Sequence, residues 1–256
     1  MSKQNEIKSL SLVLPVFKQE ETIIENISLL KNTLDRLPFP VEIIVVVDGF
    51  VDKTYSKLIE KKFDGVKVLG YEHNEGKGFA VRYGMLQAES EVIGFIDAGM
   101  DIDPSSVGMV VNHMIWYKAD VIIGSKLHPV SQVDYPFVRK ILSWGYRSMI
   151  RILFGLRIRD TQVGLKLFRK KVVKDVFPRL LVKSFAFDIE ILAVSYDRGY
   201  KRIFESPIKL NFNNSSSIIG KNFWRTIYLM MVDTLAVFYR LKILHYYDKS
   251  ESIQKI

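Results

Sequence analysis

Short apolar runs alternate with amphipathic stretches through the first half of the chain, and this alternation predicts a layered α/β fold. Runs rich in β-branched residues predict strands, and stretches with a 3.6-residue apolar period predict helices. Strands are expected at residues 10–16, 41–47, 66–71, 91–97 and 121–124, and helices at residues 20–37, 54–63, 77–88 and 104–117. This succession indicates a mainly parallel central sheet flanked by helices on both faces. Asp103 is expected to cap the fourth helix, with Pro104 at its first position.

The carboxyl ends of the predicted strands are where we expect a ligand. In an open parallel sheet, ligands bind beyond these ends, where the loops leave the strands. The rule selects residues 15–20, 48–54, 73–78, 97–103 and 125–128.

The second half of the chain predicts two unusual helices. Residues 135–156 interleave basic and apolar side chains, which suits a helix lying on an anionic membrane surface, or equally a buried helix with a solvated basic edge. Residues 223–244 are nearly all apolar, but four charged residues interrupt them, so we expect an in-plane or core-docked helix rather than a membrane span. We expect one domain at residues 1–215, including helix 135–156, and a C-terminal helix and tail at residues 216–256.

Charge is distributed unevenly along the 256 residues, whose formal net charge is +9. Residues 126–183 contain 14 Lys and Arg but only three Asp and Glu. Such a block favours a phosphate-bearing partner, and a solvated basic face is the alternative. Nucleic acid is the least favoured partner, because the basic residues alternate with aliphatic side chains rather than with aromatic residues suited to base stacking.

Several classes of chemistry are excluded by composition. The absence of cysteine removes thiolate zinc sites, disulfides, iron–sulfur clusters and cysteine nucleophiles. The four histidines are isolated and no G-x-S-x-G occurs, so paired-histidine metal sites and serine hydrolase chemistry have no support. Because residues 1–9 are polar and no long uncharged apolar run follows, we expect a cytoplasmic protein.

Two loops contain residues that could bind a metal ion or an anion. Asp97, Asp101 and Asp103 follow a predicted buried strand, and such clustered carboxylates suit Mg²⁺ or Mn²⁺, which shares its ligand sphere with substrate phosphates. The alternative is that Asp103 caps a helix and the other two are solvated. Residues 74–82 bring glycines, a Lys and an Arg to a helix start, which favours anion binding, although the segment matches neither a Walker loop nor G-x-G-x-x-G and could be a simple turn.

These motifs together resemble family 2 glycosyltransferases, which have the GT-A fold. The resemblance rests on Leu-Val-Leu-Pro-Val-Phe at 12–17, on Val-Val-Val-Asp-Gly at 45–49, and on the segments at 74–82 and 97–104. Arg-Asp-Thr-Gln-Val-Gly-Leu-Lys-Leu-Phe at 159–168, followed by Ala-Phe-Asp-Ile-Glu at 186–190, is similar to the dolichyl-phosphate glucosyltransferase and mannosyltransferase branch.

The resemblance implies inverting transfer of a hexose from a nucleotide sugar, of the UDP-glucose or GDP-mannose type, to a polyprenyl phosphate. It implies a divalent cation, Mg²⁺ or Mn²⁺, at Asp97 and Asp101, and acceptor phosphate contacts from Lys126 and Arg139, with Arg147 and Arg151 as second candidates. The donor would be bound by Pro15, Phe17, Glu20, Asp48, Gly76, Lys77, Asp97 and Ala98. We expect a peripheral enzyme on the inner face of an anionic membrane. The oligomeric state is not indicated.

One further carboxylate is expected near the acceptor or the metal. Asp188 and Glu190 lie two apart on a predicted helix, so their side chains diverge by about 200° and only one can face the cleft. The resemblance favours Asp188, which we count with Asp97, Lys126 and Arg139 as catalytic. Asp160 lines the same cavity or, alternatively, forms a turn paired with Arg159.

Three positions depart from the family pattern. Gly99 replaces the second Asp of D-x-D, so we expect a site shifted onto Asp97 and Asp101; Gln19 and Val47 replace residues of the nucleotide pocket. Two alternatives stay open at this point. One is a soluble family 2 transferase that acts on a polysaccharide or protein, and the other is a non-catalytic protein that binds a nucleotide sugar or lipid phosphate.

Overall fold

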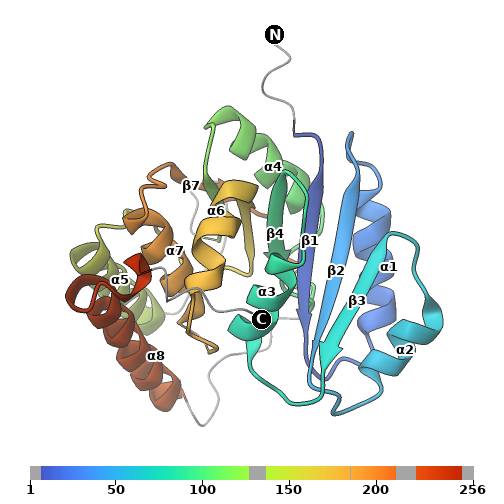
Figure 1. The fold of residues 1–256 in the computed structure, drawn as a ribbon, viewed down its shortest axis with the longest axis horizontal. Helices are drawn as coiled ribbons and strands as arrows, with labels where there is room; N and C mark the ends of the chain where they lie inside the picture. Colours follow the sequence, from blue (N-terminus) through green and yellow to red (C-terminus); the bar gives the residue numbers. More distant parts are fainter. Residues whose placement is uncertain (1–6, 127–136, 185, 212–222, 250–256) are drawn as a thin grey trace.

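A seven-stranded sheet runs through the centre of the computed structural model, which describes residues 7–126, 137–184, 186–211 and 223–249 (Figure 1). The strands are β1 (Leu10–Val16), β2 (Val41–Asp48), β3 (Val66–Tyr71), β4 (Val92–Ile96), β5 (Val121–Ser125), β6 (Leu165–Arg169) and β7 (Ile203–Pro207), in the order β3-β2-β1-β4-β6-β5-β7. Four neighbouring pairs are parallel, and only β6 runs antiparallel to its neighbours β4 and β5. The predicted mainly parallel sheet is confirmed, and the five predicted strands are present to within one residue at each end.

Strands β6 and β7 are not identified by the sequence pattern. Lys166 interrupts the apolar residues of β6, so the sequence shows no continuous apolar run, although all residues from Leu165 to Phe168 are buried. β7 contains Glu205 and ends at Pro207. β6 lies between β4 and β5, and β7 lies beside β5. Packing against these neighbours therefore forms two strands for which the sequence pattern alone gives little indication.

Helices cover both faces of the sheet, with two separate hydrophobic cores beneath them. α3, α6 and α7 pack with α5 on one face, and α1, α2 and α4 pack on the other. Their bounds are α1 (Ile23–Leu34), α2 (Thr54–Lys61), α3 (Lys77–Leu86), α4 (Ser106–Trp116), α5 (Phe137–Phe154), α6 (Lys170–Val176), α7 (Phe187–Asp197) and α8 (Phe223–Phe238). The buried central strands, apolar on both faces, are what a doubly covered parallel sheet requires.

Helix starts differ from the prediction where a turn precedes the helix. α1 begins three residues later than expected, because the amides of Thr22 and Ile23 both donate to the carbonyl of Gln19 and form a turn. α4 begins at Ser106 rather than at Pro104, so Ser105 is its N-cap. The Asp103 side chain nevertheless accepts hydrogen bonds from the Ser105 amide (2.9 Å) and hydroxyl (2.6 Å). The expected capping contact exists, but it closes a preceding turn.

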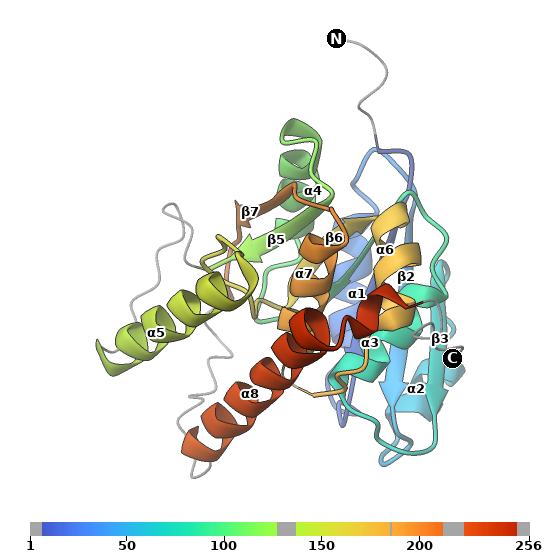
Figure 2. The same cartoon turned by 60° about the vertical axis from the view of Figure 1, so that its left-hand side comes forward.

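α5 and α8 project together from one end of the molecule (Figures 1 and 2). The Tyr146 hydroxyl lies 3.0 Å from that of Thr234, which joins the two helices. The long C-terminal helix expected at residues 223–244 is interrupted, since α8 ends at Phe238 and a π-helical turn, Tyr239–Ile243, follows. Over the described ranges, we find no helix with both the length and the apolar character that crossing a bilayer requires.

Candidate active site

A cavity of about 410 Å³ lies where β1, β2 and β4 end. Its wall is formed by Pro15, Val16, Phe17, Gln19, Asp48, Asn74, Gly76, Lys77, Asp97, Ala98 and Gly99. Seven of the eight residues predicted to bind the donor are therefore brought together. The eighth, Glu20, is not among the described lining residues; its carboxylate accepts the Lys53 amide instead (2.8 Å).

Asp97 and Lys77 form an ion pair at this cavity. Asp97 follows β4 directly, and its amide donates to the carbonyl of Gly164 (2.9 Å). The Lys77 ammonium, on the first residue of α3, lies 2.5 Å from the Asp97 carboxylate. Burial lowers the pKa of Lys77, but the charges of Asp97 and Asp188 outweigh it, so its pKa is raised. Lys77 is therefore a firmly held cation beside a partly exposed carboxylate.

Asp48 anchors the loop that leads into α3. Its carboxylate accepts hydrogen bonds from the Tyr71 hydroxyl (2.9 Å), the Asn74 side-chain amide (3.0 Å), the Glu75 amide (2.8 Å) and the Gly76 amide (3.0 Å). So many donors on one carboxylate fix the path of the backbone before Lys77. Asp48 lies on the cavity wall, and its contacts give it a positioning role there.

The start of α3 is packed against the segment that precedes α7. Gly76 has φ +96°, and a Cβ on Gly76 or Gly78 would lie 2.6 Å from a carbonyl oxygen of Lys183 or Val182, so both positions need glycine. The Gly78 amide already donates to the Lys183 carbonyl (2.9 Å). One amide of the predicted anion-binding helix start is thus occupied by protein.

Asp188 is buried behind the cavity and paired with Lys166, which is fully buried on β6. Lys166 also donates to the Val163 carbonyl (2.6 Å). Burial raises the pKa of Asp188, and the charges of Lys166 and Lys77 partly oppose that rise. Because Lys77 interacts with both Asp97 and Asp188, these side chains form a chain of alternating charge from the core to the cavity.

Glu190 faces away from this charge chain. It is fully buried, and its carboxylate accepts the amides of Leu181 and Val182 and the hydroxyl of Tyr247 (2.6 Å). It holds in place the segment that covers the start of α3. Of this pair, Asp188 interacts with Lys77 of the charge chain, and neither Asp188 nor Glu190 is among the described lining residues of the cavity.

Lys126 follows β5, at the same edge of the sheet as the cavity. Its amide donates to the Asp160 carboxylate (3.1 Å), and the amides of Arg159 and Asp160 both donate to Glu205 (3.1 and 2.9 Å). Burial raises the pKa of Asp160. No ion pair between Arg159 and Asp160 is present among the described residues. The side chain of Arg139 lies outside the described part of the chain.

The carboxylate oxygens of Asp97 suit a hard divalent cation. Mg²⁺ is usually bound through one or two carboxylates plus substrate phosphates, so Asp97 and a diphosphate can supply the necessary oxygens. Gly99 leaves space beside Asp97, since a Cβ there would have no heavy atom within 4 Å. Asp101 is exposed and is not among the described cavity residues; its carbonyl accepts the Asn211 amide (2.9 Å). Within the described ranges, no group of three or more acidic or histidine side chains is gathered for a metal.

Four cavity residues are absent from the predicted donor set: Val16, Gln19, Asn74 and Gly99. Each is adjacent in sequence, or within two residues, to a predicted one, so the strand-end rule had already selected their loops. The side-chain carbonyl oxygen of Gln19 is buried in the cavity wall and has no hydrogen-bond partner within the described structure, so it is available to accept a hydrogen bond from a ligand.

The mainly parallel sheet, with a pocket at its carboxyl edge and a carboxylate directly after β4, is a GT-A fold. The sequence profile of glycosyl transferase family 2 matches residues 11–177. The chain belongs to this family and is a glycosyltransferase. The predicted family resemblance is confirmed, and the non-catalytic alternative is not supported.

Within this family, the chain is similar to several dolichyl-phosphate beta-glucosyltransferases. A dolichyl-phosphate beta-glucosyltransferase of Trichomonas vaginalis is 30% identical over 251 residues, covering 91% of this chain and 74% of that protein. The Drosophila melanogaster and human enzymes of the same name are 33% and 31% identical, covering 72% and 85% of this chain. The match spans 61% of the Drosophila protein and 71% of the human protein.

A solved structure has the same fold. Glucosyl-3-phosphoglycerate synthase from Mycobacterium tuberculosis, in complex with Mn²⁺, UDP-glucose and phosphoglyceric acid, aligns with a TM-score of 0.64 at 16% identity. The alignment covers 91% of this chain and 79% of that chain.

Proposed function

We propose that this glycosyltransferase moves glucose from UDP-glucose to a polyprenyl phosphate, with inversion at the anomeric carbon. The observation that carries the proposal is the cavity in which Asp97 and Lys77 meet at the carboxyl edge of the sheet. The names of the relatives support glucose and a lipid phosphate, and UDP in the structural neighbour supports a uridine nucleotide. GDP-mannose is the competing donor.

The chemistry needs positioning and charge stabilisation more than a strong base. A lipid phosphate is already an anionic nucleophile near neutral pH. Its oxygen forms a bond to the anomeric carbon as the bond from that carbon to the diphosphate oxygen breaks, and the nucleoside diphosphate leaves with the electron pair. Lys77 can stabilise this leaving group, because its ammonium lies at the cavity wall and is held in the charged form.

Mg²⁺ or Mn²⁺, when bound, would add Lewis-acid stabilisation of the leaving diphosphate. Asp97 would hold the ion. Asp101 is exposed outside the described cavity lining, so it would have to approach Asp97 to act as the second carboxylate of the shifted site. The Lys77–Asp97 pair means that Asp97 already has a cationic partner before any ion binds. Lys77 therefore has to share or release this carboxylate.

The acceptor side is assigned to Lys126, Arg139 and Asp188. Lys126 lies at the same edge of the sheet as the donor cavity, and Asp188 is electrostatically coupled to Lys77. Asp188 is buried and paired with Lys166, so we give it the role of holding Lys77 in place by charge. Direct contact with the acceptor phosphate falls to the two basic residues.

Exposed apolar side chains on the projecting helices support a lipid acceptor. Trp144 on α5 and Tyr228 on α8 are each 67% exposed, and Ile152 on α5 is 82% exposed. Such side chains beside basic residues of α5 suit the surface of an anionic membrane. This surface supports a peripheral membrane enzyme, and the cytoplasmic face is the side that we expect from the sequence. A soluble polysaccharide or protein acceptor would not require this surface.

A product assay tests the proposal. Purified protein is incubated with Mn²⁺, a polyprenyl phosphate and either UDP-glucose or GDP-mannose, and the lipid phase is analysed by mass spectrometry. We expect glucosyl phosphoryl-lipid from UDP-glucose and none from GDP-mannose. Product from GDP-mannose alone would overturn the donor assignment. Flotation with anionic vesicles is run in parallel, and failure to float would favour the soluble alternative.

A further inference from the structure

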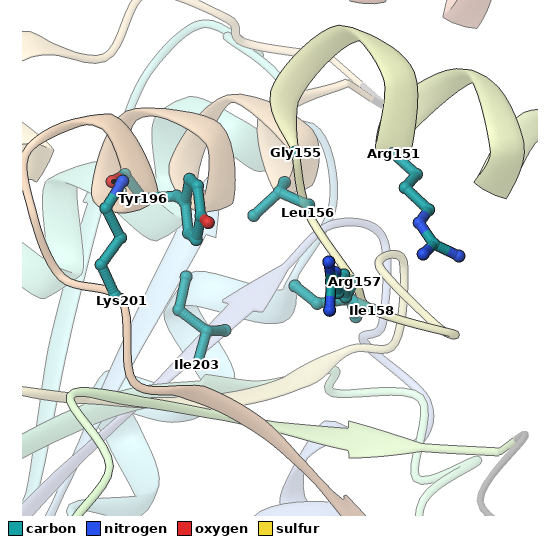
Figure 3. Close-up of a pocket in the computed structure, with 8 residues that line it drawn as sticks. All are labelled: Arg151, Gly155, Leu156, Arg157, Ile158, Tyr196, Lys201 and Ile203. Atoms are coloured by element: carbon teal, nitrogen blue, oxygen red, sulfur yellow. Dashed lines mark hydrogen bonds between the residues drawn. The ribbon is translucent and has the colours of Figure 1, made fainter.

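A second cavity, of about 530 Å³, opens where α5 ends (Figure 3). Gly155 terminates α5 with φ +72°, and its amide donates to the carbonyl of Arg151 (3.0 Å). The chain then leads to β6, and on the way the amides of Arg159 and Asp160 donate to Glu205 of β7. Side chains from α5, from residues 156–158, from α7 and from the start of β7 line this cavity.

This cavity lies at the amino ends of the parallel strands, whereas the cavity lined by Asp97 and Lys77, here called the donor pocket, lies at their carboxyl ends. Ile203, one of its lining residues, is the first residue of β7 and pairs in parallel with Val121, the first residue of β5. β4 and β5 are both antiparallel to β6, so they point in the same direction. The donor pocket lies beyond the last residues of the parallel strands, whereas this cavity lies beside the first residues of β5 and β7.

Three cations line the cavity, and its described lining contains no carboxylate. They are Arg151, Arg157 and Lys201. Both arginines are exposed, and neither guanidinium makes an ion pair or hydrogen bond with any described residue. Lys201 is held in place, since its ammonium donates to the Tyr196 carbonyl (2.5 Å) and lies 3.6 Å from the centre of the Tyr196 ring.

The acidic residues nearest in sequence are Asp160, Asp197 and Glu205, and each has another partner. Asp160 accepts the Lys126 amide (3.1 Å). Asp197 pairs with Lys242 (2.5 Å), and Glu205 accepts the amides of Arg159 and Asp160. Like charges gathered around one cavity repel one another, and an anion placed between them would remove that repulsion. The guanidinium group of arginine offers two parallel donors that match phosphate oxygens.

The floor of the cavity is apolar. Leu156 and Ile158 are 2% and 8% exposed. In Figure 3, Leu156, Ile203 and the Tyr196 ring stand between Lys201 on one side and the two arginines on the other. A fully hydrated anion gains nothing from such a floor, whereas an anion attached to a hydrocarbon chain buries carbon against it. The neighbouring α5 residue Ile152 is 82% exposed, so apolar surface continues outside the cavity.

We propose that this cavity binds the phosphate monoester headgroup of an anionic lipid. The phosphate lies between Arg151 and Arg157, and the first carbons of the lipid contact Leu156 and Ile203. This site is separate from the Asp97 cavity, so Arg151, expected from the sequence as a second candidate for the acceptor phosphate, is assigned to this lipid site instead. It would bind a lipid headgroup whether or not the acceptor is a polyprenyl phosphate.

Calorimetry on the full chain tests the proposal, with UDP and Mn²⁺ present so that the donor pocket is occupied. The probes are short-chain dioctanoyl phosphatidic acid as a monomer, dioctanoyl phosphatidylcholine and glycerol 3-phosphate. We expect one phosphatidic acid per chain, with affinity at least about tenfold higher than for either other probe. The variant Arg151→Gln/Arg157→Gln is expected to weaken phosphatidic acid binding by about tenfold or more.

A matched control removes the same charge elsewhere. Lys61→Gln/Lys67→Gln changes two exposed lysines on α2 and β3, at the opposite edge strand of the sheet, and is expected to leave binding within about twofold. Lys201→Gln alone provides a second variant, with a smaller loss. The proposal is overturned if phosphatidic acid does not bind, if glycerol 3-phosphate binds equally well, or if the arginine variant loses no more affinity than the control.

Discussion

Gly164 lies directly against the carboxylate of Asp97. The two residues stand at adjoining ends of the antiparallel pair β4 and β6, and the Asp97 amide donates to the Gly164 carbonyl (2.9 Å). A Cβ on Gly164 would come within 2.1 Å of an Asp97 carboxylate oxygen. The glycine of the Arg-Asp-Thr-Gln-Val-Gly run thus leaves the space that the proposed metal-binding carboxylate occupies, which connects two motifs that are far apart in sequence.

Gly164→Ala is therefore expected to displace the Asp97 side chain while the fold persists, because the clash involves the far end of a movable side chain. Binding of UDP with Mn²⁺, measured by calorimetry, should weaken by about tenfold or more. Gly145→Ala on α5 is the control, since a Cβ there meets no heavy atom within 4 Å. The control should keep its nucleotide affinity and gain about 0.5–1 kcal/mol of stability. Unchanged UDP binding by Gly164→Ala would contradict the role given to this contact.

The Lys77 ammonium is proposed to stabilise the donor diphosphate, and Lys77→Gln tests this. Loss of a charge-assisted contact worth about 1.5–3 kcal/mol should weaken UDP-glucose binding by about tenfold or more. Uridine, which has no phosphate, should bind the variant and the wild type equally. Lys61→Gln on α2 is the matched control and should change neither affinity. Equal losses for uridine and UDP-glucose would mean that the substitution disturbs the whole pocket rather than the phosphate contact.

Most of the fold follows from local pattern, and the exceptions have a common physical origin. The five predicted strands are short runs rich in apolar and β-branched residues, and their alternation with helices indicates at which ends of the strands a ligand binds. β6 is different, because its central Lys166 is fully buried and is neutralised by Asp188, a residue 22 positions later. Neither residue type predicts a buried position, and the compensating pair exists only once the chain has folded.

The site likewise has features that the sequence predicts and features that depend on tertiary contacts. The loops that line the donor cavity are predicted by the strand-end rule together with the family resemblance. The role of Asp48 is not, because four hydrogen-bond donors reach it from residues 71–76, across the β2–β3 pair. A sequence pattern identifies Asp48 as a residue of the cavity, but only the three-dimensional contacts show that it also positions the start of α3.

The shifted metal site makes a prediction about two carboxylates. Asp97→Asn should reduce transfer by about a thousandfold or more, since the charge stabilisation of several kcal/mol expected from a bound cation would be lost. Asp101→Ala should retain activity but require a higher Mn²⁺ concentration for half-maximal rate. Asp103→Asn is the control from the same loop; its carboxylate is engaged by Ser105 and Lys209 (3.1 Å), so the metal titration should not change. An Asp101→Ala enzyme with the wild-type titration would reject the shifted site.

The ion pairs of Asp120, the residue just before β5, are expected to make the stability of the fold depend on pH. Its carboxylate is buried and pairs with Lys171 (2.8 Å) and Arg202 (3.1 Å). Burial raises the pKa of Asp120, but the hydrogen bonds and charges of these two cations outweigh it and lower the pKa below 3.8. A lowered folded-state pKa means that the carboxylate stabilises the fold above its unfolded value, and that this contribution is lost as pH falls through the folded value.

Asp120→Asn should accordingly lower the free energy of unfolding by about 1–3 kcal/mol near neutral pH, measured by urea denaturation. The difference between wild type and variant should shrink progressively once the pH falls below about 4. Asp35→Asn, which removes a more exposed carboxylate from a pair with Lys31 on α1, is the control and should change stability by less than about 1 kcal/mol. A difference for Asp120→Asn that stays constant across this pH range would show that the ion pairs with Lys171 and Arg202 are not its source.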